Sequence, residues 1–182
     1  MNIVIMGSPG SGKSTQAELL AEELGLQRLS TGGVCRQLRR EDSELGRRVR
    51  AVYDKGELVS DQEMLQLLNW ALAKPAYQGG FILDGYPRNL WQVENAPRAF
   101  DRVIYLAVSD EEGLKRLLGR AEKAGRADDT PEVIADRLEI YHGETEPVLD
   151  YYRRQGILEE VDGERSVADI FEDILSRLEG QK

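Results

Sequence analysis

A glycine-rich segment at residues 7–15 directly follows the short apolar run Ile3–Met6. Its letters, GSPGSGKST, match the pattern G-x-x-x-x-G-K-[ST], in which glycines let the backbone curl around an anion without a Cβ in the way. A helical pattern over Ser14–Gly25 comes next, so a positive helix N-terminus would point at the same anion. Lys13 adds a mobile positive charge for the outer phosphates. A glycine-rich turn alone would lack this context, and the strand, loop and helix together predict a nucleoside triphosphate site.

The composition is typical of one soluble globular domain. Of the 182 residues, 41% are hydrophobic and 31% are charged, and no apolar stretch approaches the roughly 18 residues of a membrane span. The formal net charge of -9 disfavours general attraction to nucleic acid or to an anionic membrane. The single cysteine, Cys35, excludes an internal disulfide and a cysteine-based zinc site. We therefore expect a cytoplasmic protein without a secretory signal, whose phosphate ligand is held by a local cluster of Arg and Lys.

Apolar runs alternate with amphipathic patterns along most of the chain. One helical pattern begins near Asp61, which we expect to be its N-cap. Pro131 suits the first turn of another helix, and a further helical pattern covers Val167–Leu178. Strands that alternate with helices imply a parallel sheet covered on both faces, with ligands at the carboxyl ends of the strands. The strands are predicted at residues 2–6, 27–29, 81–84, 103–108 and 157–161.

Two segments depart from this pattern. Residues 30–60 contain two short helical segments that are rich in Arg and poor in large apolar side chains. Residues 121–130 form a polar, glycine-containing link between two helices. Both are interpreted as insertions into a single domain over residues 1–182. The predicted fold class is α/β, with a five-stranded parallel sheet of the P-loop NTPase type and helices on both faces.

A phosphate loop is shared by many ATPases and GTPases, so other residues must indicate the reaction. Three further clusters combine arginines with Thr, Asp or Gln side chains. They are Leu29-Ser30-Thr31-Gly32 with Arg36, Asp84-Gly85-Tyr86-Pro87-Arg88 with Gln92, and the group Arg116, Arg120, Arg126-Ala127-Asp128-Asp129 and Arg137.

With these motifs, in this order and over nearly its whole length, the sequence resembles the nucleoside monophosphate kinases, and among them the short-lid adenylate kinase family. The resemblance implies reversible transfer of a phosphoryl group from ATP to AMP, which gives two ADP, with Mg2+ and without zinc. It also implies a monomer, an AMP-binding insertion at residues 30–60 and a short lid at residues 121–131. The AMP phosphate is already an anion, so no general base is required, and His142 is expected on the surface.

The resemblance also assigns AMP-binding roles to particular residues. Arg36 and Arg88 would clamp the AMP phosphate, for which two guanidinium groups are suited. Gln92 would hydrogen-bond adenine, because a carboxamide offers both a donor and an acceptor. The complete AMP-binding set is Thr31, Gly32, Arg36, Leu58, Val59, Gly85, Arg88, Gln92, Arg126 and Arg137.

On the ATP side, the resemblance implies that Arg116 stacks on adenine and that Asp84 holds Mg2+ through bound water. Ser14 or Thr15 would be a further metal ligand. The structural alternatives are a turn cap for Asp84 and a solvated helix face for the arginines. The implied catalytic set is Lys13, Arg88, Arg120, Arg126 and Arg137. The implied ATP-binding set is Gly10, Ser11, Gly12, Lys13, Ser14, Thr15, Arg116, Arg120 and Gly163.

The sequence departs from the family pattern on the AMP side. Gly33 stands where Asp is usual, and Ser60 where Pro is frequent, and both changes are expected to loosen AMP binding. Asn89 after Arg88 is frequent among pyrimidine kinases, whereas Thr31 and Gln92 favour AMP. A UMP/CMP kinase of the same fold is therefore one alternative function. A protein that binds ATP without transferring phosphate is the other.

Overall fold

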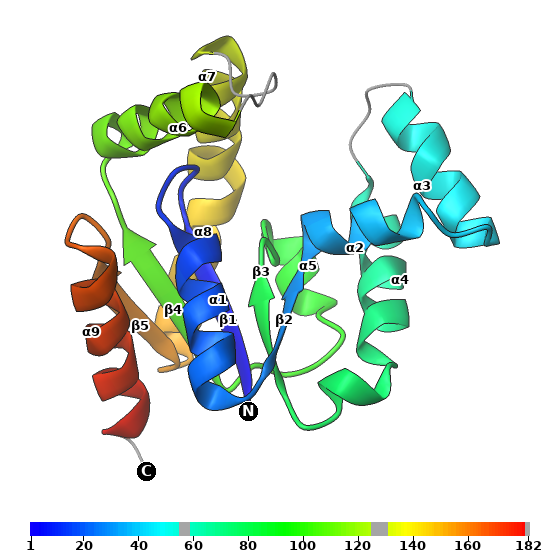
Figure 1. The fold of residues 1–182 in the computed structure, drawn as a ribbon. Helices are drawn as coiled ribbons and strands as arrows, with labels where there is room; N and C mark the ends of the chain where they lie inside the picture. Colours follow the sequence, from blue (N-terminus) through cyan, green and yellow to red (C-terminus); the bar gives the residue numbers. More distant parts are fainter. Residues whose placement is uncertain (55–58, 125–130, 181–182) are drawn as a thin grey trace.

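A five-stranded parallel sheet forms the centre of the computed structural model, which describes residues 1–54, 59–124 and 131–180 (Figure 1). The strands are β1 (Asn2–Gly7), β2 (Gln27–Ser30), β3 (Phe81–Asp84), β4 (Arg102–Ala107) and β5 (Leu158–Asp162). Their order is β2-β3-β1-β4-β5, and every neighbouring pair is parallel. The five predicted strands are thus confirmed.

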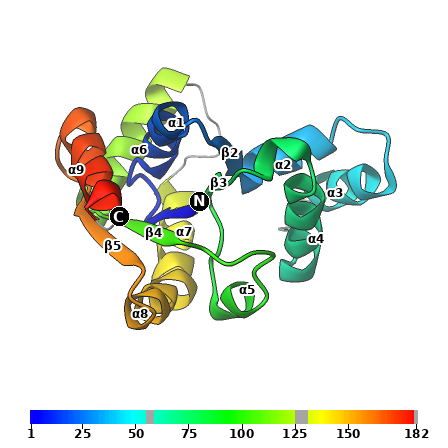
Figure 2. The same cartoon turned by 90° about the horizontal axis from the view of Figure 1, so that it is seen from below.

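Helices cover both faces of the sheet, as the α/β prediction requires. Figure 2 shows α1 (Lys13–Leu24) and α9 (Val167–Glu179) on one side of the strands, and α5 (Leu90–Glu94) and α8 (Glu146–Arg154) on the other. The remaining helices are α2 (Thr31–Leu38), α3 (Glu44–Asp54), α4 (Asp61–Leu72), η1 (Pro75–Tyr77), α6 (Asp110–Ala124), α7 (Pro131–Ile140) and η2 (Tyr141–Thr145). Within the three described ranges, no helix is both long and apolar enough to cross a membrane.

Side chains that alternate along β1 enter two separate hydrophobic cores. Ile3 and Ile5 are buried with Leu20 in the core beneath α1 and α9. Val4 and Met6 are buried in the core on the opposite face. Because both faces of the strand are covered, its sequence is continuously apolar, and this is the property that made β1 predictable.

The phosphate loop between β1 and α1 packs closely against the start of α6. Gly10 has a φ of +85°, and a Cβ there would lie 2.3 Å from the carbonyl oxygen of Gly113. A Cβ on Gly113 would in turn lie 2.8 Å from the carbonyl oxygen of Pro9. Two glycines therefore allow the backbones of the loop and of α6 to touch, which fixes the distance between them.

The chain leaves the sheet after β2 and forms helices before it returns at β3. Helices α2 and α3 lie with α4 beyond the edge strand β2 (Figure 1). Leu38, Val49 and Leu67 are buried within this group. Of the second predicted insertion, residues 121–124 belong to α6, and residues 125–130 lie outside the described residues. The roles of the two segments as AMP-binding insertion and lid stay predictions.

The start of α4 corrects one detail of the sequence analysis. The helix begins at Asp61, but its N-cap is Ser60 and not Asp61. The Ser60 hydroxyl accepts from the Glu63 N–H (3.3 Å), while the Ser60 hydroxyl and N–H donate to the Glu63 carboxylate (2.8 and 3.2 Å). These bonds hold the pKa of Glu63 below its usual 4.5. Asp61 does not act as the cap because its carboxylate accepts from the side chains of Asn89 and Gln92.

We predict that Ser60→Ala lowers the free energy of unfolding by about 1 kcal/mol at pH 7, because the capping hydroxyl is lost. Because the pKa of Glu63 is lowered in the folded state, its carboxylate contributes fully to the free energy of unfolding above pH 4.5. This contribution is lost as the pH falls through the lowered pKa. The difference between parent and variant should therefore shrink in acid. Urea denaturation at several pH values measures this difference in the free energy of unfolding. Ser60→Thr is the control, because it keeps a hydroxyl cap. Equal stability of Ser60→Ala and parent at pH 7 would contradict the assigned cap.

The single histidine lies in η2, a π-helical turn between α7 and α8. His142 is exposed, as predicted, with 44% of its side chain accessible. Its Nε2 lies 3.0 Å from Asp110 Oδ2 and its Nδ1 lies 3.2 Å from Glu146 Oε2. These two carboxylates, Asp110 first, raise the pKa of His142 above 6.5. The protonated ring therefore connects the first residue of α6 to the first residue of α8.

We predict that the His142 ring titrates above pH 6.5, and that Asp110→Asn lowers its pKa because a partner of the charged ring is removed. The contribution of the contacts between His142 and the two carboxylates to stability is full below pH 6.5. It is lost as the pH rises through the raised pKa of His142. An NMR titration of the one histidine measures this directly. Glu111→Gln, an exposed neighbour on the same helix, is the matched control. A parent pKa at or below 6.5 would rule out the contact in solution.

Candidate nucleotide-binding site

The phosphate loop opens to solvent immediately before α1. Gly12 is the N-cap of α1, with φ 87° and ψ 5°, and a Cβ there would meet open space beyond its own chain neighbours. The first N–H groups of a helix have no partner within it, so this opening suits an anion. Lys13 Nζ donates to the carbonyl oxygen of Ser8 at 3.1 Å, which keeps the ammonium group close to the loop. The loop therefore combines a helix N-terminus with a nearby positive charge.

The end of β3 lies beside this loop. Asp84 pairs with Ile5 across the sheet and is only 4% exposed. Its Oδ2 accepts from the Ser14 hydroxyl at 2.7 Å and from Arg28 Nη2 at 2.6 Å. Thr15, the other hydroxyl considered for a metal, lies one residue further along α1, and both residues are exposed. Of the two hydroxyls, Ser14 is the one that contacts the carboxylate.

The oxygen donors at this point suit Mg2+. A carboxylate and a hydroxyl are hard ligands, and Mg2+ commonly takes one or two carboxylates together with substrate phosphates and waters. Among the residues that the structure describes, no group of three or more His, Cys, Asp and Glu side chains is arranged to hold a metal. An ion at Asp84 could take further oxygen ligands from water and from a phosphate on the adjacent loop.

A cavity of about 470 Å³ opens next to the phosphate loop. It is lined by Gly10, Ser11, Gly12, Lys13, Ser14, Thr15, Gln16, Arg116, Leu117, Arg165, Ser166, Val167 and Ile170. Arg116 donates to Glu112 Oε1 and to the carbonyl oxygen of Gly163, both at 2.8 Å. The Arg116 contact, with a weaker one from Lys115, lowers the pKa of Glu112. The structure thus brings the predicted ATP-side residues Arg116 and Gly163 together beside the loop.

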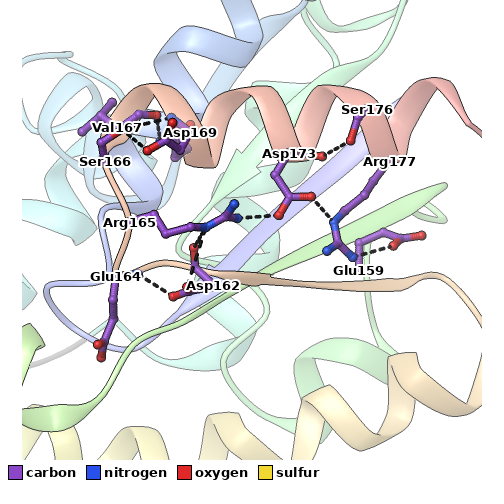
Figure 3. Close-up of polar contacts among 11 residues, drawn as sticks. Glu159, Asp162, Glu164, Arg165, Ser166, Val167, Asp169, Asp173, Ser176 and Arg177 are labelled. Atoms are coloured by element: carbon purple, nitrogen blue, oxygen red, sulfur yellow. Dashed lines mark hydrogen bonds and ion pairs between the residues drawn. The ribbon is translucent and has the colours of Figure 1, made fainter.

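The segment Arg165–Val167 forms part of this cavity wall and was missed by the sequence analysis. Figure 3 shows Arg165 between the end of β5 and α9, where it pairs with Asp162 (3.6 Å) and with Asp173. Val167 is 52% exposed although it is apolar. One sequence signal was present, because these residues follow Gly163 just beyond the carboxyl end of a predicted strand, where α/β sheets bind ligands.

A second cluster forms where β3 and β2 end. Thr31 Oγ1 and Arg88 Nε both donate to the carbonyl oxygen of Gly85, at 3.4 and 2.9 Å. Gly85 has a φ of +89°, and a Cβ there would lie 2.7 Å from Thr31 Oγ1. Arg36 lies above the same turn of α2, since a Cβ on Gly32 would be 3.2 Å from its Nη1. Five predicted AMP-side residues are therefore gathered, with Arg36 and Arg88 both exposed.

Gln92 is buried beside this cluster, and the structure already engages its amide. Its Oε1 accepts from the Arg88 N–H at 2.7 Å, and its Nε2 donates to Asp61 Oδ1 at 2.6 Å. Asn89 also donates to Asp61, at 2.9 Å. Asp61 therefore orients the amide of Gln92. The sequence pattern predicts only a helix cap at Asp61, and no local pattern indicates its contacts with Asn89 and Gln92.

The remaining predicted residues are placed less completely. The side chain of Val59 is partly buried and packs against the core beside α3 and α4. Arg137 lies in the last turn of α7 and is partly buried. Leu58 and Arg126 lie outside the described residues, as does the side chain of Arg120.

Comparisons with known proteins agree with this architecture. The family model described as adenylate kinase matches residues 5–157. An adenylate kinase of Maricaulis maris is 42% identical over 186 residues, which cover 98% of this chain and 99% of the relative. An adenylate kinase of Stenotrophomonas maltophilia (strain R551-3) is 42% identical over 187 residues, covering 99% and 100%. One from Kocuria rhizophila is 40% identical over 184 residues, covering 97% and 98%. The chain therefore belongs to the adenylate kinase family of phosphotransferases.

Proposed function

We propose that the protein transfers the terminal phosphoryl group of ATP to AMP, reversibly and with Mg2+, so that two ADP are formed. The adjacency of two phosphate-binding clusters, at the carboxyl ends of β1 and β3, carries this proposal. The phosphate loop with Lys13 follows β1, Gly85 and Arg88 follow β3, and the 2.7 Å hydrogen bond from Ser14 to Asp84 joins them. A donor and an acceptor phosphate bound here would be neighbours, as direct transfer requires. Family membership supports the same reaction.

ATP would bind with its phosphates on the loop and its nucleoside in the cavity of about 470 Å³. Lys13 would follow the β- and γ-phosphates. Arg116 would stack on adenine, and its hydrogen bond to the Gly163 carbonyl keeps the guanidinium at the cavity wall. The ATP-binding set remains Gly10, Ser11, Gly12, Lys13, Ser14, Thr15, Arg116, Arg120 and Gly163.

AMP would bind at the second cluster, with its phosphate between Arg36 and Arg88. Gln92 would offer adenine the second hydrogen of Nε2 and the remaining lone pair of Oε1, while Asp61 and the Arg88 N–H keep their existing bonds. The other members of this set are Thr31, Gly32, Leu58, Val59, Gly85, Arg126 and Arg137.

When bound, Mg2+ supplies a divalent charge that offsets the charge on the phosphate oxygens during transfer. Asp84 would hold the ion through bound water. Ser14 is favoured over Thr15 as a further ligand, because its hydroxyl already lies 2.7 Å from the carboxylate.

Catalysis in this proposal depends on alignment and charge neutralisation, because the acceptor oxygen of AMP carries no proton to remove. Lys13 and Arg88 offset the repulsion between the two polyanions, and Arg120, Arg126 and Arg137 would do so from the lid side. Water is a competing acceptor, so closure of residues 30–60 and 121–131 over both nucleotides would exclude it.

Preference for AMP over UMP or CMP is part of the proposal. Asn89 was the one side chain that favoured a pyrimidine kinase. It is the N-cap of α5, where its Oδ1 accepts from the Gln92 N–H at 2.9 Å. A capping role explains Asn89 without reference to the base of the substrate.

We also propose that the enzyme acts as a monomer in the cytoplasm on small nucleotides, and not on nucleic acid or membranes. The net charge of -9 supports the preference for small ligands, since a phosphate polymer or an anionic membrane would be repelled. The local cations at the two clusters are the exception to this acidic surface.

Product analysis tests the reaction and its specificity. The protein is incubated with Mg-ATP and, separately, with AMP, CMP, UMP or no acceptor. We predict ADP formation only with AMP, at two ADP for each AMP consumed. A preference for CMP or UMP would transfer the assignment to a pyrimidine kinase. Nucleotide binding without transfer to any acceptor would indicate a sensor and overturn the mechanism.

Replacing Lys13 tests the phosphate loop. We predict that Lys13→Met lowers kcat by at least about a hundredfold, because one fixed charge on the transferring phosphate is lost. Thermal unfolding should stay close to that of the parent. Lys115→Met removes the same charge from an exposed position on α6 and is the control. Turnover of Lys13→Met within about threefold of the parent would exclude Lys13 from this role.

A further inference from the structure

Arg28 on the edge strand β2 contacts the carboxylate that was assigned to the metal. Its Nη2 donates to Asp84 Oδ2 at 2.6 Å, and its Nη1 pairs with Glu18 of α1. The Arg28 side chain is 22% exposed, the Asp84 side chain 5% and the Glu18 side chain 68%. One end of the guanidinium therefore meets a buried carboxylate and the other meets a carboxylate in solvent.

These contacts are the ones that compensate the burial of Arg28. Its Nε is buried without a hydrogen-bond partner among the described residues. A guanidinium taken out of water is unfavourable unless its charge is paired, so Asp84 and Glu18 hold Arg28 in place. Asp84 in turn receives two donors on one oxygen, from Arg28 and from Ser14. The carboxylate is thus oriented and its charge offset by the protein itself.

A divalent cation that approaches Asp84 meets this resident positive charge. Two cations that share one carboxylate repel each other, and the repulsion is weakly screened where the carboxylate is buried. A guanidinium that moved towards Glu18 would leave more of the Asp84 charge to the metal. Glu18 already pairs with Arg28 Nη1, so it is the partner that Arg28 keeps when the Asp84 carboxylate turns to the metal.

We propose that Arg28 is a positioning residue for the metal site, which holds Asp84 before the metal arrives and competes with Mg2+ for its charge. This inference rests on the proposed function only in placing Mg2+ at Asp84. Arg28 thereby sets the concentration of divalent cation at which the metal–nucleotide complex forms. Glu18 lowers this concentration, because it attracts Arg28 away from Asp84.

Metal affinity can be measured without turnover. Mn2+ is titrated into protein saturated with the β,γ-imido analogue of ATP, and free Mn2+ is followed by electron paramagnetic resonance. We expect Arg28→Gln to tighten Mn2+ binding by about three- to tenfold, because the competing charge is gone. Arg28→Lys should stay nearer to the parent. Arg47→Gln removes an equal charge from an exposed pair with Asp42 and should change nothing.

Glu18→Gln provides a second test at an exposed position, where folding is safe. With Glu18 neutral, Arg28 stays on Asp84, so Mn2+ binding should weaken by about three- to tenfold. Glu18→Gln added to the Arg28→Gln variant should change Mn2+ affinity little, because Glu18 acts on the metal site through Arg28. If Arg28 only ties β2 to α1, Arg28→Gln will lower the unfolding temperature and leave Mn2+ affinity equal to that of Arg47→Gln. That result, or weaker Mn2+ binding by Arg28→Gln, would overturn the proposal.

Transfer by the parent enzyme separates this inference from the proposed function. A parent that binds Mn2+ with the ATP analogue but gives no ADP would contradict the proposed function, and the variants would still decide the role of Arg28. A parent that transfers phosphate to AMP, with a Mn2+ affinity that Arg28→Gln leaves unchanged, would contradict the role of Arg28 alone.

Discussion

The register between β1 and β3 is the constraint on which the rest of the site depends. Ile5 pairs with Asp84, so the two strands end at the same edge and continue into different loops. The Ser14 hydroxyl then reaches Asp84 at 2.7 Å and ties the first turn of α1 to the end of β3. A slip of one residue would turn Asp84 to the other face of the sheet, away from this contact. Successive side chains of both strands pack into opposite hydrophobic cores, and a slip would exchange them between the two cores, so this packing holds the polar site in place.

Positively charged side chains gather at this edge of the sheet, although the chain as a whole is acidic. The protein carries a formal net charge of -9, yet Lys13, Arg28, Arg36 and Arg88 all lie near the ends of β1, β2 and β3. A local cationic cluster on an acidic protein gathers a small polyanion without attracting a polymeric one. Asp84 is the buried anion within this cluster, and its pairing with Arg28 offsets the charge of that carboxylate before any ligand binds.

Much of the fold could be predicted because its signals are local. β1 is a short run buried on both faces, and the loop after it needs positive φ angles that the glycines of the motif supply. The N-cap of α4 could not be predicted in the same way. Ser60 and Asp61 are both good capping residues, and the choice depends on Asn89 and Gln92, which are 28 and 31 residues from Asp61 and bind its carboxylate. A local rule was therefore overridden by a distant contact.

By itself, the sequence determined the α/β class, the five strands, the phosphate loop and the candidate residues that the described structure gathers into two clusters. These features depend on periodicity and on motifs within a few residues, which a single chain displays directly. The tertiary structure alone decided that Arg28 pairs with Asp84, 56 residues away, and that Arg165–Val167 line the cavity beside the loop. Such contacts follow from the order of the strands in the sheet, and ion pairs between distant residues leave no periodic trace in the sequence.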